Sequence, residues 1–175
     1  MERDIMRVAI DIAPSSWDKT RTHWDKLGPF YEGNPDSKRG ARHTHAWGAN
    51  IGSFVYSFSL PSGPWISARL SARLSSEYAW FSAPPNHFSD VAVEINGAMH
   101  PARRVIPDNG TGRIYAWSLD PVHLQEGRNE LGFVIKAGAP YRNGLCIYHR
   151  AVVPNERDYA ILLEAERRTP INRRG

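Results

Sequence analysis

Within residues 65–75, apolar and polar residues alternate without interruption from Ile66 to Ser75. Every even-numbered residue from Ile66 to Leu74 is apolar, and every odd-numbered residue from Ser67 to Ser75 is Ser or Arg. Side chains of a β-strand point alternately to its two faces, whereas a helix would spread these apolar positions around its circumference. The pattern therefore predicts a strand with one buried and one solvated face, as in an antiparallel sheet.

Other short apolar segments predict partner strands. Asn96-Gly97 is typical of a two-residue hairpin turn, because both positions take positive φ. Residues 14–50 show few strand signals, so we expect a packed loop there or a short helix at 17–27. We expect one helical turn within 120–127. Further strands are predicted at 5–12, 51–60, 90–96, 98–106, 112–119 (with Ile114 or Tyr115 inward), 129–137, 144–153 and 157–165.

About nine strands joined by short turns, without a long helical period, predict an all-β fold: a single-domain antiparallel β-sandwich of the jelly-roll kind. Residues 50–166 are expected to form the sandwich. Residues 1–49 would add a first strand and a long loop region packed on it, and residues 167–175 a basic flexible tail. The predicted core contains Phe58, Leu70, Leu74, Val93, Phe133 and Ile147.

Composition and charge narrow the class of protein. The chain has 175 residues, 41% of them hydrophobic, which is typical of a globular domain. The net charge is +4, but residues 167–175 hold four Arg and no acidic residue, and the remaining chain has equal numbers of basic and acidic residues. A neutral body with a basic tail does not indicate a nucleic-acid partner.

The single cysteine, Cys146, excludes an internal disulfide framework and a cysteine-based zinc site, and its apolar surroundings predict a buried thiol. No segment is long enough to span a membrane. Arg7 and Asp11 interrupt the first apolar run, so we expect no signal peptide. An extracellular location is expected if the chain is part of an exported enzyme.

Antiparallel strands place successive connections at alternate ends of the sandwich. The long-loop end would gather residues 28–50, 76–89, 107–111 and 138–143, and the turn end would gather 61–64, 96–97, 120–128 and 153–157. Sandwiches commonly present binding loops at one end. Aromatic rings can contact the C–H face of a sugar while amides and Arg bind its hydroxyls. The predicted ligand-binding residues are Trp47, Trp80, Asp108, Asn109, Tyr141, Arg142 and Asn143.

Two segments carry a family resemblance. Val93-Glu-Ile-Asn-Gly97, followed by Leu124-Gln-Glu-Gly-Arg-Asn-Glu-Leu131, resembles the galactose-binding-like β-sandwiches. These include the sugar-binding domain of family 2 glycoside hydrolases and several carbohydrate-binding modules. The resemblance covers residues 50–165 and encodes turns and core. It implies a jelly roll, often a structural calcium, and often carbohydrate binding beside a neighbouring catalytic domain. Many members bind nothing and only pack against their neighbours.

Few residue sets suggest chemistry. His43-x-His45 has the spacing of some metal sites but lacks further ligands, and solvated loop histidines are the alternative. Tyr148, His149 and Arg150 faintly resemble the residues of polysaccharide lyases, although alternation puts His149 on the other face. Three functions are therefore open. The first is a noncatalytic carbohydrate-binding module, the second a structural domain of a larger enzyme, and the third a small jelly-roll lyase.

Overall fold

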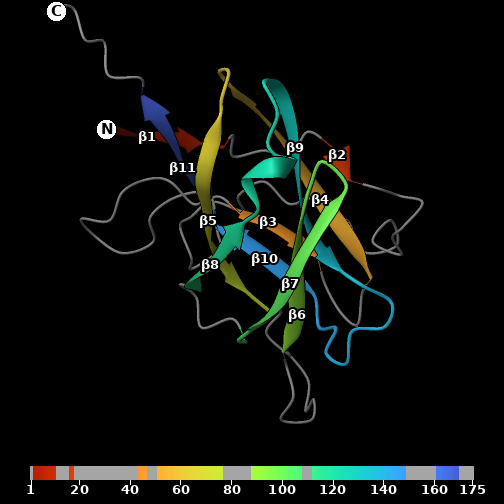
Figure 1. The fold of residues 1–175 in the computed structure, drawn as a ribbon. Helices are drawn as coiled ribbons and strands as arrows, with labels where there is room; N and C mark the ends of the chain where they lie inside the picture. The colour runs from red at the N-terminus through yellow and green to blue at the C-terminus, as the bar shows by residue number, and fades with distance from the viewer. Residues whose placement is uncertain are drawn as a thin grey trace, which may run out of the picture.

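Two antiparallel β-sheets pack face to face in the computed structural model of the chain (Figure 1). One sheet has six strands and the other has five. The fold class predicted from the sequence, an antiparallel β-sandwich, is confirmed. The structure describes residues 2–10, 16–17, 43–46, 51–76, 88–107, 112–148 and 161–169.

The strand with the strict alternation is central to the first sheet. It is β5 (Trp65–Ser75), and its bounds are those predicted from the pattern. On one edge β5 pairs with β8 (Arg113–Leu119). On its other edge it pairs with β11 (Ile161–Thr169) and then with β10 (Leu145–Tyr148). The sheet continues beyond β11 with β1 (Glu2–Ala9), and beyond β10 with β3 (His43–Ala46).

The second sheet has the order β2-β4-β9-β6-β7. Asn96 (φ 48°) and Gly97 (φ 86°) form the turn between β6 and β7, which confirms the predicted hairpin. A single 3-10 turn, η2 (Pro121–His123), lies within the connection where one helical turn was expected. The strands are β2 (Ser16–Trp17), β4 (Gly52–Leu60), β9 (Gly127–Ile135), β6 (Ser89–Ile95) and β7 (Ala98–Val105).

The core lies between the sheets. Trp117 of the first sheet meets the ring of Phe133 of the second edge-on, with 6.0 Å between ring centroids. Aromatic pairs favour this geometry, and it joins the two layers. The prediction of the core from alternation is confirmed, because all of its members are buried: Phe58, Leu70, Leu74, Val93, Phe133 and Ile147.

Polar contacts close the sandwich where β7 meets β8. The indole Nε1–H of Trp117 donates to the Pro101 carbonyl oxygen at 3.0 Å. The backbone N–H of Ile106 donates to the hydroxyl of Tyr115 at 2.9 Å. Tyr115 packs against the core while Ile114 is 63% exposed, so of the two residues predicted for the inward position, Tyr115 occupies it.

Both ends of β5 depart from the simple pattern. At its start, Ile66, predicted to be buried, is exposed; at its C-terminal end, Arg73 and Ser75, predicted to be solvated, are buried. Ser75 pairs with Cys146 on β10, and its hydroxyl lies 3.4 Å from that of Tyr148. Cys146 and Tyr148 are both fully buried, so this end of the sheet is covered on both faces. The burial of the Cys146 thiol is as predicted.

Two predicted segments are longer or more ordered than expected. Within 14–50, where few strand signals occur, β2 and β3 pair with β4 and β10. At the other end of the chain, β11 runs to Thr169, into the stretch predicted to be a tail. Arg167 pairs with Asp4 of β1, and their Nε and Oδ2 atoms are 2.8 Å apart. The strand continues because β1 supplies both a backbone partner and a carboxylate.

Among the described residues, no helix has the length and apolar character needed to cross a bilayer.

Candidate functional site

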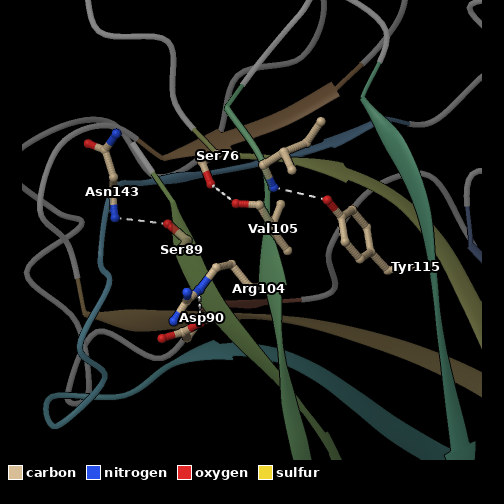
Figure 2. A network of polar contacts seen from close by, with 8 residues as sticks. Ser76, Ser89, Asp90, Arg104, Val105, Tyr115 and Asn143 are labelled. Atoms are coloured by element: carbon tan, nitrogen blue, oxygen red, sulfur yellow. Dashed lines mark hydrogen bonds and ion pairs between the residues drawn. The ribbon is translucent and has the colours of Figure 1, made fainter. Parts of the chain in front are cut away.

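Segments predicted to meet at the long-loop end do meet there. The backbone N–H of Ser76, after β5, donates to the Ile106 carbonyl oxygen, after β7, at 2.7 Å. Figure 2 shows this region, in which the Ser76 hydroxyl also bonds to the carbonyl oxygen of Val105. The described parts of three predicted loops, 76–89, 107–111 and 138–143, thus lie at one end of the sandwich. For these parts the assignment of loops from strand alternation is confirmed.

The connection between β9 and β10 is fastened to the start of β6. The Asp90 N–H donates to the Tyr141 carbonyl oxygen at 3.0 Å. The hydroxyl of Ser89 accepts from the Asn143 N–H at 2.8 Å and donates to the Gly144 carbonyl oxygen at 2.6 Å (Figure 2). Ser89 is fully buried, so water does not compete for these bonds. They hold the connection in one position.

A groove of about 810 Å³ lies between this connection and β7. Ala92 of β6 contributes a small side chain to its lining. The pairing of β6 with β7 shifts register between Val91 and Val93, where a β-bulge interrupts the ladder. The lining consists of Asp90 and Ala92, then Met99, His100, Pro101 and Ala102, and finally Lys136, Gly138, Ala139 and Pro140.

An aromatic–guanidinium cluster, formed by Phe88, Arg104 and Tyr141, borders the groove. The Cζ atom of Arg104 lies 3.9 Å from the centroid of the Tyr141 ring. Phe88 meets the Tyr141 ring edge-on, with 6.0 Å between centroids. The Nε atom of Arg104 is 3.4 Å from Oδ1 of Asp90, which itself lines the groove (Figure 2). The cluster and the groove therefore form one continuous surface.

This surface combines the two kinds of group that polyols require. Tyr141, Phe88 and Met99 offer apolar area on which the C–H face of a ring can pack. Lys136 and Arg104 are donors, and Asp90 is an acceptor, for hydroxyl groups. Because the Tyr141 ring is held between Arg104 and Phe88, it needs little ordering when a ligand arrives.

The predicted ligand-binding residues are distributed unevenly. Tyr141 belongs to the cluster. Arg142 and Asn143 lie in the same connection, where Arg142 Nη1–H donates to the Ala137 carbonyl oxygen at 2.9 Å. Trp47, Trp80, Asp108 and Asn109 lie outside the described residues.

Several residues of this surface were not predicted. Arg104 and Met99 belong to β7, which was read only as the second strand of a hairpin. Pro101 within that strand was the available signal, because proline inside a sheet is confined to edge strands and bulges. β7 is indeed an edge strand of the second sheet, and its consecutive residues 99–102 line the groove.

The described residues give no support to a metal site at His43 and His45 or to a catalytic site at Tyr148, His149 and Arg150. His43 and His45 lie in β3, not in a loop, and their side chains are outside the description. No group of three or more His, Cys, Asp or Glu in the described ranges is placed to hold a metal ion, including the calcium implied by the resemblance. Tyr148 of the lyase-like set is fully buried, while His149 and Arg150 lie beyond the described part.

Comparisons with known proteins give structural neighbours only. No family model matches the chain, and no curated protein matches it. A family 29 carbohydrate-binding module, in a mutant complexed with mannohexaose, is 10% identical with a TM-score of 0.44, over 94% of this chain and 93% of that one. A ruminal family 26 endo-β-1,4-mannanase is 14% identical with a TM-score of 0.41, over 90% of this chain and 28% of that one.

An exo-β-1,3-galactanase from Phanerochaete chrysosporium, in complex with β-1,3-galactotriose, is 19% identical with a TM-score of 0.34. It covers 62% of this chain and 26% of the galactanase. The chain thus spans about a quarter of each of the two hydrolases. Its own strands form a two-sheet antiparallel β-sandwich, in which the Asn96-Gly97 hairpin and Asn129 lie where the sequence resemblance puts them.

Proposed function

We propose that this domain is a noncatalytic carbohydrate-binding module, and that it binds its glycan along the groove and the aromatic–guanidinium cluster. The observation that carries the proposal is the Tyr141 ring, fixed against Arg104 at the border of the groove. The sequence resemblance supports it, because galactose-binding-like domains often bind carbohydrate. The mode of binding follows from three properties of the surface.

The first property is size. A volume of about 810 Å³ lies within the range of roughly 300–1,000 Å³ in which small-ligand sites are found. The groove is lined on one side by an edge strand and on the other by the connection after β9. Such an open-sided trough suits a chain of sugar rings better than a single enclosed metabolite.

The second property is rigidity. Three hydrogen bonds, from Asp90 to Tyr141 and through the Ser89 hydroxyl to Asn143 and Gly144, fix the wall of the groove to β6. A site that is ordered before binding loses less conformational entropy when the ligand binds. This smaller entropy loss matters for polyols, because each hydroxyl only exchanges a hydrogen bond to water for one to the protein and so adds little binding free energy.

The third property argues for binding without catalysis. Glycoside hydrolysis uses two carboxyl groups placed on either side of the scissile bond. Asp90 is the only carboxylate among the described groove residues, and Arg104 is paired with it. His100 also lines the groove, but its Nε2 accepts a bond from the Asp120 N–H at 3.3 Å. We therefore place any catalytic activity in a neighbouring domain, to which this one would be an accessory.

The test is binding by the native protein on a glycan array, followed by affinity gels with the selected polymers. Tyr141→Ala should weaken binding by about tenfold or more, as expected for a contact aromatic. Arg103→Ala is the matched control, because this exposed residue precedes Arg104 and points to the other face of the strand.

Native protein that binds no glycan would overturn the proposal and leave a domain that packs against a neighbour. Turnover of uronate polymers, followed through the ultraviolet absorbance of an unsaturated product, would identify a lyase instead.

A further inference from the structure

Positive charge borders the groove on both sides. Lys136 lines it from the connection after β9. Arg104 stands in the cluster next to it, with a side chain that is 52% exposed. Arg142, also exposed, belongs to the same connection as Lys136. A glycan lying along the groove would therefore meet a cation on each flank.

Donor groups on these cations are free within the described part of the chain. Arg104 uses Nε for Asp90 and the face of its guanidinium for Tyr141 and Phe88, which leaves both Nη groups without a partner there. The Lys136 ammonium has no hydrogen bond or ion pair to any described residue. An exposed ammonium and the open edge of a guanidinium are the usual ligands of carboxylate and sulfate groups.

Negative charge on the same surface is shielded. The Asp90 side chain is only 14% exposed and its Oδ1 atom lies 3.4 Å from Arg104. Its charge is thus partly offset by the guanidinium. Asp90 also lines the groove together with Lys136, so the groove and the cluster hold, among the described residues, two cations, Lys136 and Arg104, and one carboxylate. This excess of positive charge favours a negatively charged group on a ligand.

We propose that this surface binds an acidic glycan, whose carboxylate or sulfate groups contact Lys136 and Arg104 while a sugar ring packs on Tyr141. This inference rests on the proposed function and specifies its ligand class. The neutral polyol suggested by the loop composition would leave both cations without a function. Stacking on Tyr141 fixes the plane of the Arg104 guanidinium, so its two Nη groups can bind both oxygens of one carboxylate.

Calorimetric titration of the native protein with four probes tests the inference. The probes are oligogalacturonate, the same oligomer with its carboxyl groups methyl-esterified, a sulfated galactan oligomer, and mannohexaose. The acidic oligomers should bind at least tenfold more tightly than the esterified one at low salt. The difference should shrink as sodium chloride is raised, because exposed charges are screened. The affinities for oligogalacturonate and for the sulfated oligomer show whether the surface prefers carboxylate or sulfate groups.

Variants locate the effect. Lys136→Met and Arg104→Met should each lose about tenfold in affinity for the acidic oligomer and little for the esterified one. Arg103→Met, which removes an equal charge from the adjacent position, should change neither. An unchanged melting temperature for Lys136→Met is expected, since its side chain is exposed.

Equal affinity for the acidic and esterified oligomers would overturn this inference and leave carbohydrate binding intact. If the protein binds none of the four probes and no other glycan, both this inference and the proposed carbohydrate-binding function are overturned.

Discussion

The two ends of the sandwich use polar side chains in opposite ways. At the turn end, Asn129 is fully buried and all of its capacity is used inside the protein. Its Oδ1 accepts from Asn96 Nδ2 at 2.8 Å and from the Gln125 N–H at 3.0 Å. Its Nδ2 donates to the carbonyl oxygens of Gln125 and Gly127. These bonds lock the hairpin turn to the connection before β9.

At the long-loop end, donors remain for a ligand. Lys136 and the Nη groups of Arg104 have no partner among the described residues, and Tyr141 lies between an aromatic edge and a guanidinium. Figure 1 shows the two ends at opposite poles of the sheets. The end that carries the Asn96-Gly97 turn and Asn129 is a structural lock. The opposite end, which has no such motif, is the one for which we propose ligand binding.

The largest loss of stability is expected from a substitution in the middle of β5, and the effects at the two ends are compared with it. Leu70 is fully buried at the centre of the first sheet. Leu70→Ala should lower the free energy of unfolding by roughly 2–5 kcal/mol, measured by urea denaturation, because it leaves a cavity in a packed core. A loss below about 0.5 kcal/mol would mean that the interface between the sheets is not tightly packed there.

At the turn end, Asn129→Ala should lower the free energy of unfolding by about 2–4 kcal/mol, because it leaves several buried partners unsatisfied. Affinity for the glycan should not change. The neighbouring Arg128→Ala is the control, since it removes only an exposed ion pair with Glu130 and should cost at most about 0.5 kcal/mol. If Asn129→Ala is as stable as the native chain, the hydrogen bonds of Asn129 do not stabilise the turn end.

Much of the turn end could be predicted from the sequence, because its determinants are local. Asn96-Gly97 defines a turn by itself, and the alternation of residues 65–75 defines the buried face of a strand. The groove could not be predicted in this way. It depends on a bulge opposite Ala92, and on contacts such as Arg104 with Tyr141 and Ser89 with Asn143 that join distant parts of the chain.

The third prediction concerns the bonds that hold the wall of the groove. Ser89→Ala removes the hydroxyl between Asn143 and Gly144 and should cost about 1–2 kcal/mol of stability. It should also weaken glycan binding, although Ser89 is buried and does not touch the ligand, because the connection after β9 loses its anchor. Calorimetric titration measures the second effect. Native affinity in a destabilised Ser89→Ala protein would show that this anchor does not position the site.

The smallest effect is expected at the end of β11, beside Trp65. Deletion of residues 167–175 removes the last three pairs of β11 with β1 and the Arg167–Asp4 ion pair, whereas deletion of 170–175 keeps them. The first truncation should be less stable than the second by at most about 1 kcal/mol, because the ion pair is partly exposed. Thermal melts of the two proteins give the difference. Identical melting temperatures would show that the last pairs of this strand add nothing.

The central claim is that the long-loop end binds carbohydrate and the turn end does not. Amide chemical shifts of the native protein during titration with oligogalacturonate, and separately with mannohexaose, test it most directly. The shifts with the acidic oligomer should concentrate at Asp90, Arg104 and the connection after β9, and should leave Asn96 and Gln125 unchanged. Shifts concentrated around Asn96 and Gln125, or no shifts with any glycan, would contradict it.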